Sequence, residues 1–191
     1  MKIAVIIFII LTLIIIYSEV LTESFETVQK LATDNKMYYV QDYSNNQEAA
    51  NVLSRLVQNS LNLIDYIASK YPNNQGVKRL KEKFNPDKIR EAEHEKDSTS
   101  YTINTGEMMH LCLRQKDSNK SIHDDNLLMF VIIHELAHIM SQSIGHNNEF
   151  YDNFKFLLRE SVKKGIYTPV NFQKTPVNYC GINVTNNPYY G

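Results

Sequence analysis

One short pattern constrains this 191-residue chain more than any other feature of its sequence. His134 and His138 are four residues apart, Glu135 stands beside the first, and the preceding residues Val131 to Ile133 are apolar. In a helix, residues at this spacing lie on one face, a turn apart. The apolar neighbours predict a largely buried helix, and buried imidazoles and carboxylates require polar partners. The fold must therefore bring other groups to this polar stripe.

The same three side chains have the spacing of a zinc-binding helix in peptidases. Two imidazoles at i and i+4 can bind one ion, and a carboxylate beside the first can hold a water molecule on that ion. We therefore predict that His134 and His138 bind one Zn²⁺ ion and that Glu135 is a general base. The alternative interpretation is a pair of core histidines satisfied by the glutamate.

A catalytic zinc takes three protein ligands and keeps one position for water, so a third ligand is expected. His146 is favoured, because Gly145 can end the helix and let the chain turn back towards the ion. Glu160, on the next predicted helix, is the competing ligand. Glu149 and Asp152 are weaker candidates, which could instead orient a ligand imidazole. The pattern HExxHxxGxxH is disfavoured, because its third histidine comes earlier than the one found here.

Peptide hydrolysis would also need a hydrogen-bond donor to the developing oxyanion. The candidates for this role are Tyr151, Tyr167, Tyr179 and His110. Because the chain contains 12 tyrosines, a structural role is favoured for each of them. His94 and His123 are expected to be exposed loop residues.

Hydrophobic periodicity predicts helices on both sides of the motif. Apolar residues recur at three- and four-residue steps from Asn45 to Lys70, which indicates an amphipathic helix. The motif helix is expected to begin at Asp124 or Asp125, either of which can cap it. A second amphipathic helix is predicted from Phe150 to Val162.

The remaining segments predict strands and irregular structure. A β-hairpin is expected over residues 100–113, with a glycine in its turn at 104–106. A short strand is expected at 37–40. Residues 78–97 are dense in charge and are interpreted as a solvated helical face. The tail, 167–191, is expected to be irregular and to wrap over the core.

The amino terminus is strongly apolar: 15 of the first 17 residues are hydrophobic. As a helix these residues would span about 23–26 Å, close to the roughly 30 Å of a bilayer core. Residues 16–18 are a poor match to a cleavage site, so an uncleaved signal anchor is favoured over a signal peptide. We expect a single-pass membrane protein inserted through residues 3–17, with its amino terminus cytoplasmic and its domain luminal or extracellular, or else a secreted protein.

The chain is thus divided into a signal anchor or signal peptide at 1–17, a polar connector with some helical character at 18–36, and one domain at 37–191. The net charge of −1 gives no strong signal for nucleic-acid binding. Two cysteines are too few for a disulfide-dense or four-cysteine zinc protein. Cys112 and Cys180 can form one disulfide or remain two buried thiols.

HELAH at 134–138, followed by GHNNEF at 145–150, resembles the zincin metallopeptidases of the WLM and SprT-like groups. The similarity covers roughly residues 125–165. Tyr-Cys-Gly at 179–181 and Asn-Pro at 187–188 are similar to segments of uncharacterised WLM-like proteins of large DNA viruses. The resemblance implies zinc at His134, His138 and His146, with Glu135 as the base. It also implies a minimal zincin-like α+β fold, with a small, mostly antiparallel sheet whose edge strand lies over the active helix.

Taken together, these features predict a zinc-dependent endopeptidase that acts on a protein or peptide through a zinc-bound water. A non-catalytic zincin-like structural or binding protein, for example a virion or membrane component, is the first alternative. The glutamate of the motif argues against it, since zinc binding alone does not need a base. A peptidase for proteins crosslinked to DNA, as in some WLM and SprT-like relatives, is the second alternative, and the apolar leader and near-neutral charge argue against it.

Overall fold

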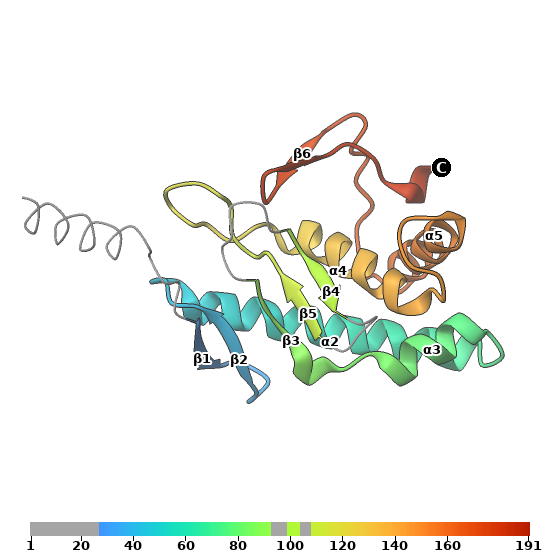
Figure 1. The fold of residues 1–191 in the computed structure, drawn as a ribbon, viewed down its shortest axis with the longest axis horizontal. Helices are drawn as coiled ribbons and strands as arrows, with labels where there is room; N and C mark the ends of the chain where they lie inside the picture. The colour runs from blue at the N-terminus through green and yellow to red at the C-terminus, as the bar shows by residue number, and fades with distance from the viewer. Residues whose placement is uncertain (1–26, 93–98, 104–107) are drawn as a thin grey trace, which may run out of the picture.

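A computed structural model describes residues 27–92, 99–103 and 108–191, which form an α+β structure (Figure 1). The described elements, in chain order, are β1 (Thr27–Leu31), β2 (Met37–Gln41), α2 (Asn46–Lys70), α3 (Gln75–Lys83), η1 (Pro86–Lys88), β3 (Ile89–Glu91), β4 (Tyr101–Ile103), β5 (Met108–Leu111), α4 (Asp125–Met140), α5 (Asn148–Lys163), β6 (Val177–Tyr179), β7 (Ile182–Val184) and η2 (Pro188–Tyr190).

Helix α4 is the core helix around which the other elements pack. It contacts α2, α3 and α5, and strand β4 also reaches it. Its residues are apolar on nearly every side, from Leu127 to Met140, which is typical of a helix buried all round. Asp124 begins it by accepting hydrogen bonds from the backbone amides of Asn126 and Leu127. The three helices predicted from periodicity are therefore confirmed as α2, α4 and α5.

A three-stranded sheet lies across these helices, in the order β3-β5-β4. Strand β4 is antiparallel to β5, which confirms the predicted hairpin, although the turn expected at 104–106 falls outside the described residues. Strand β3 is parallel to β5. Since β4 is at the edge of the sheet and contacts α4, the sheet presents an edge strand beside the motif helix.

Two segments before the β4–β5 hairpin differ from their expected structure. Residues 27–31, expected to belong to a polar connector with helical character, form β1, which pairs antiparallel with β2 at 37–41. Residues 89–91, expected on a solvated helical face, form β3, and Glu91 in it is fully buried. The charge pattern was misleading here because the buried glutamate has a cationic partner far along the chain.

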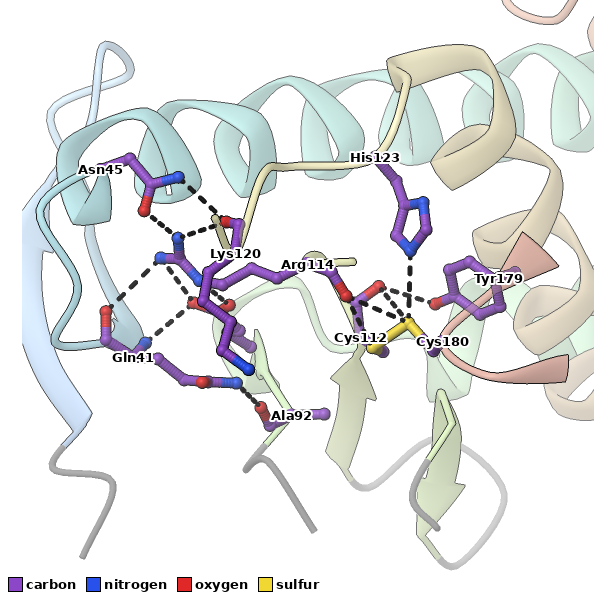
Figure 2. Close-up of polar contacts among 10 residues, drawn as sticks. Gln41, Asn45, Ala92, Cys112, Arg114, Lys120, His123, Tyr179 and Cys180 are labelled. Carbon is purple, nitrogen blue, oxygen red and sulfur yellow. Dashed lines mark hydrogen bonds and ion pairs between the residues drawn. A yellow bond between two sulfur atoms is a disulfide. The ribbon is translucent and has the colours of Figure 1, made fainter. Parts of the chain in front are cut away.

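Arg114 is that partner, and it joins several segments inside the protein (Figure 2). Its Nε atom lies 2.7 Å from Oε1 of Glu91, and both side chains are buried. The guanidinium also donates to the side chain of Asn45 and to the backbone carbonyls of Gln41 and Lys120. The start of α2, strand β2 and strand β3 are therefore tied together by one buried cation.

The tail also differs from its expected irregular structure, because β6 and β7 form a hairpin above α4 (Figure 1). Its two-residue turn, Cys180 and Gly181, has φ angles of 50° and 90°, as a type I′ turn requires. Of the two states considered for the cysteines, the structure has the disulfide between Cys112 and Cys180. The bond joins the hairpin turn to the residue after β5.

The membrane localisation expected from the sequence is not supported. Among the helices of the described ranges, none is both long and apolar enough to cross a bilayer. The hydrophobic segment on which that prediction rested, residues 3–17, lies outside the described residues. The result for the described helices contradicts the single-pass assignment, which we withdraw.

Replacing Arg114 tests the buried ion pair. Arg114→Met should lower the free energy of unfolding by about 3–5 kcal/mol, because the Glu91 carboxylate would remain buried without a counter-charge. Urea denaturation followed by circular dichroism measures the change. The matched control is Arg55→Met, whose pair with Asp125 is half-exposed and should contribute about 0–1 kcal/mol. Equal losses in the two variants would contradict the role given to Arg114.

Candidate metal centre

Three histidine side chains converge at the carboxyl end of α4. His134 and His138 come from the helix, and His146 comes from the turn between α4 and α5. The Nε2 atom of His138 lies 3.2 Å from those of His134 and His146, and the latter two are 3.0 Å apart. The three ring nitrogens therefore form a nearly equilateral triangle.

The turn that carries His146 is held by a glycine conformation and by hydrogen bonds to Glu149 in the first turn of α5. Gly145 has a φ of +88°, a conformation that favours glycine. The Glu149 carboxylate accepts hydrogen bonds from the backbone amides of Gln142 and Ser143, 2.8 and 3.0 Å away. Several hydrogen bonds lower the pKa of Glu149 to about 2, and the bond from the Gln142 amide has the largest effect. Glu149 therefore binds the backbone of the turn that carries His146.

The ring of Phe150 packs against all three imidazoles. Its centroid lies 4.8, 4.4 and 4.6 Å from those of His134, His138 and His146, respectively, and its side chain is fully buried. Phe150 stands in the first turn of α5, whose amino-terminal cap is the side chain of Asn147. Helix α5 thus places an apolar ring against all three imidazoles, and this packing limits their rotamers.

The triangle fits a tetrahedral zinc ion. With Zn–N bonds of about 2.0–2.1 Å, tetrahedral geometry places two ligand nitrogens about 3.3 Å apart. The observed separations of 3.0–3.2 Å are close to that edge. Burial, with a smaller effect of the neighbouring histidines, lowers the pKa of His134 to about 3 and that of His138 to about 4. Both imidazoles are therefore neutral at physiological pH, which is the form that binds metal.

Glu135 is the buried carboxylate of the site. Its Oε2 atom accepts a hydrogen bond of 2.6 Å from Thr102 Oγ1, and the side chain is almost fully buried. Burial raises the pKa of the Glu135 carboxyl to about 7, and the hydrogen bond from Thr102 opposes that shift. A carboxyl group with a pKa near neutrality can both accept and release a proton at physiological pH.

Thr102 was not identified from the sequence as a site residue. It reaches Glu135 because β4 packs against α4 at this point. Packing of a strand on a helix leaves no pattern in the local sequence. Ser100, just before β4, was missed for the same reason, and its hydroxyl contacts that of Tyr179 and accepts from the amide of Cys112. The position of both residues in the predicted hairpin before the motif was the only available signal.

The competing metal ligands lie elsewhere. Glu160 is buried in α5, where its two oxygens pair with Lys70 at 2.8 Å and Lys163 at 2.5 Å, so it does not take part in the histidine cluster. Asp152 is exposed on α5. Among the residues that the structure describes, the cluster of potential ligands found is that of His134, His138 and His146, whose ligand atoms all lie within 4.8 Å of one another.

Of the four candidates for an oxyanion donor, two line the cavity next to the histidines and two do not. Tyr151 and Tyr179 line the cavity next to the histidines. The hydroxyl of Tyr179, however, donates to the carbonyl of Cys112 at 2.9 Å. Tyr167 is buried in the core, where its hydroxyl accepts from Asn187. His110 is stacked on Tyr101, with ring centroids 4.7 Å apart.

The two histidines expected in exposed loops have different outcomes. His123 is buried, which contradicts the prediction, because its ring packs on Tyr179 and its Nε2 atom lies 3.6 Å from Sγ of Cys180 (Figure 2). The loop that contains it is covered by the β6–β7 hairpin. His94 lies outside the described residues.

The fold and site together define an α+β protein in which three histidines converge. Two of them lie on α4 together with a buried glutamate, and the third lies in the turn after that helix. A family model described as the WLM domain matches residues 32–188, and the chain therefore belongs to the WLM family. An uncharacterized protein of Acanthamoeba polyphaga mimivirus is 33% identical over 165 residues, which cover 84% of this chain and 83% of the relative.

Shorter matches link the chain to two iridescent viruses. An uncharacterized protein of Invertebrate iridescent virus 3 is 41% identical over 87 residues, covering 45% of this chain and 52% of the relative. Another, of Invertebrate iridescent virus 6, is 37% identical over 83 residues, covering 42% and 44% respectively. The relatives found are thus uncharacterised proteins of large DNA viruses, as the resemblance had indicated. No solved structure matches the chain.

Metal analysis tests the histidine cluster. The full chain should bind one Zn²⁺ ion, and His146→Ala should weaken zinc binding by more than about 100-fold, because removal of a direct ligand exceeds the 10–100-fold effect typical of groups that only orient ligands. Elemental mass spectrometry and competition with a fluorescent chelator measure stoichiometry and affinity. Glu160→Gln is the control and should keep full zinc. Full occupancy in His146→Ala would exclude His146 as a ligand.

Proposed function

We propose that this protein is a zinc-dependent endopeptidase with a minimal zincin-like fold. The observation that carries the proposal is the joint placement of three histidine Nε2 atoms 3.0–3.2 Å apart and of the buried Glu135 carboxylate on α4, the helix that also bears His134 and His138. Membership of the WLM family supports it, since that family is associated with metallopeptidases. A site that only bound metal would have no use for a proton-accepting group at this position.

His134, His138 and His146 would hold the zinc ion. When bound, zinc lowers the pKa of its water towards 7 and polarises the carbonyl of the scissile bond. Glu135 accepts the proton of the attacking water and delivers it to the leaving nitrogen. Thr102, through its hydrogen bond, holds the carboxylate in the orientation that these transfers require.

Strand β4 supplies a place for an extended substrate. It is at the edge of its sheet, and its residue Thr102 contacts Glu135. A peptide that paired with this edge would form backbone hydrogen bonds along β4 and bring its carbonyl groups past the proposed base. The geometry therefore favours a protein or peptide in extended conformation as the substrate.

A substitution at Glu135 separates a peptidase from a non-catalytic zinc protein. Glu135→Gln should keep one zinc ion per chain and lower peptide cleavage by at least about 10²-fold, because the amide cannot accept the proton. Cleavage of a randomised peptide mixture, followed by mass spectrometry, measures the activity.

Asp152→Asn is the matched control, because Asp152 is an exposed carboxylate on the neighbouring helix. It should cleave at the wild-type rate. Absence of cleavage by the zinc-loaded wild-type chain would favour the non-catalytic alternative, and unchanged turnover in Glu135→Gln would refute its assignment as base.

A further inference from the structure

A cavity of about 320 Å³ opens beside the histidine cluster. His134, Glu135 and His146 line one part of it. The remaining walls come from four parts of the chain, which are the residues before β4 (Thr99, Ser100), α4 (Phe130, Val131), α5 (Phe150, Tyr151, Phe154), and Tyr179 of β6 together with the segment from β7 to Pro188. The cavity and the proposed reacting groups therefore share a boundary.

The lining of the cavity is suited to an apolar group. Among the described residues that line it, Glu135 is the one charged side chain, and it belongs to the proposed catalytic site. Phe130 and Phe154 pack together with ring centroids 5.2 Å apart, and Val184 of β7 also lines the cavity. An anionic guest would find no counter-ion in these walls, and a cationic guest would find only Glu135 of the proposed catalytic site, whereas an aromatic or branched aliphatic guest would bury its surface against rings and methyl groups.

The size of the cavity limits its guest. A volume of about 320 Å³ is at the lower end of the range for small-molecule sites, about 300–1,000 Å³. It accommodates a single large side chain more readily than a folded element or a dinucleotide. Because the boundary includes His134, His146 and Glu135, that side chain would belong to a residue next to the bond being cleaved.

The wall formed by β7 is held in place covalently. The turn of the β6–β7 hairpin contains Cys180, which is bonded to Cys112 (Figure 2). Tyr179, at the end of β6, also donates a hydrogen bond to the carbonyl of Cys112 at 2.9 Å. The hairpin is therefore fixed to the residue after β5 at two adjacent points, so Val184 in it is a stable wall of a preformed cavity.

We infer that this cavity selects the substrate by binding a large apolar side chain, such as phenylalanine or leucine, at a residue adjacent to the scissile bond. The inference rests on the proposed peptidase function and specifies its substrate class. Peptides with phenylalanine or leucine beside the cleaved bond should have kcat/KM values at least about 10-fold higher than those with alanine, aspartate or lysine there, since a few methylene groups in an apolar pocket contribute 10-fold or more.

Substitutions at Val184 test the assignment, because its side chain lines the cavity without belonging to the metal site. Val184→Trp should fill the cavity and lower cleavage of phenylalanine peptides at least about 10-fold while sparing alanine peptides. Val184→Lys should shift the preference towards glutamate. Cleavage-site profiling of a randomised peptide mixture, with zinc content measured on the same samples, reads out both changes.

Val177→Trp is the matched control. Val177 pairs with Val184 across the hairpin and is also half-buried, but it does not line the cavity. Its profile should match the wild type. A flat wild-type profile, a preference for charged residues, or equal changes in the Val177 and Val184 variants would overturn the inference while leaving the peptidase function intact.

A binding measurement separates failure of the inference from failure of the proposed function. N-acetyl-phenylalaninamide and N-acetyl-alaninamide are titrated into the zinc-loaded chain, and the methyl signals of Val131 and Val184 are followed by NMR. Selective shifts with the phenylalanine probe in a chain that cleaves nothing would refute the peptidase and retain the apolar cavity. Absence of shifts in the methyl signals of both valines would refute the cavity as a binding site.

Discussion

The packing of α5 against α4 through Phe150 is the contact on which the histidine cluster depends. One aromatic ring lies within 4.8 Å, centroid to centroid, of all three imidazoles. Two histidines on one helix would converge by helical geometry alone, but the third comes from a seven-residue turn and needs a fixed position. Phe150, packed against the rings, and Glu149, bonded to the backbone of the turn, provide it, so the three histidines are positioned by two adjacent residues of α5.

The remaining structure places other groups around this pair of helices. The edge strand β4 brings Thr102 to the carboxylate of Glu135, and the β6–β7 hairpin covers the apolar cavity. Neither element is large, and each is held by a contact distant in sequence. Arg114 ties β3 to β2 and to the start of α2, and the Cys112–Cys180 bond ties the hairpin to the sheet. The proposed site is therefore built on two helices and completed by short strands that long-range contacts position.

Several of the features that were predicted correctly from the sequence depend on periodicity within one helix. Helix α4 and the grouping of His134 with His138 follow from spacing along a single helix, and Asp124, one of the two predicted caps, is the one found. His146 was also placed correctly beside them, because a glycine before it indicated a turn. Strand β3 was missed, since the burial of Glu91 depends on Arg114, 23 residues later. The burial of His123 and the β6–β7 hairpin were missed as well, because both depend on Tyr179 and Cys180, which pack against distant parts of the chain.

The disulfide has a further consequence for a protein proposed to cut peptide bonds. Cys112 and Cys180 are 68 residues apart, and α4, α5 and the turn with His146 all lie between them. That turn is exposed, as is Gly165 after α5. A single backbone nick at either place, including one made by another copy of the protein, would leave both fragments joined through sulfur. The disulfide-closed loop that contains the histidine cluster would thus keep the two fragments of a cut chain connected.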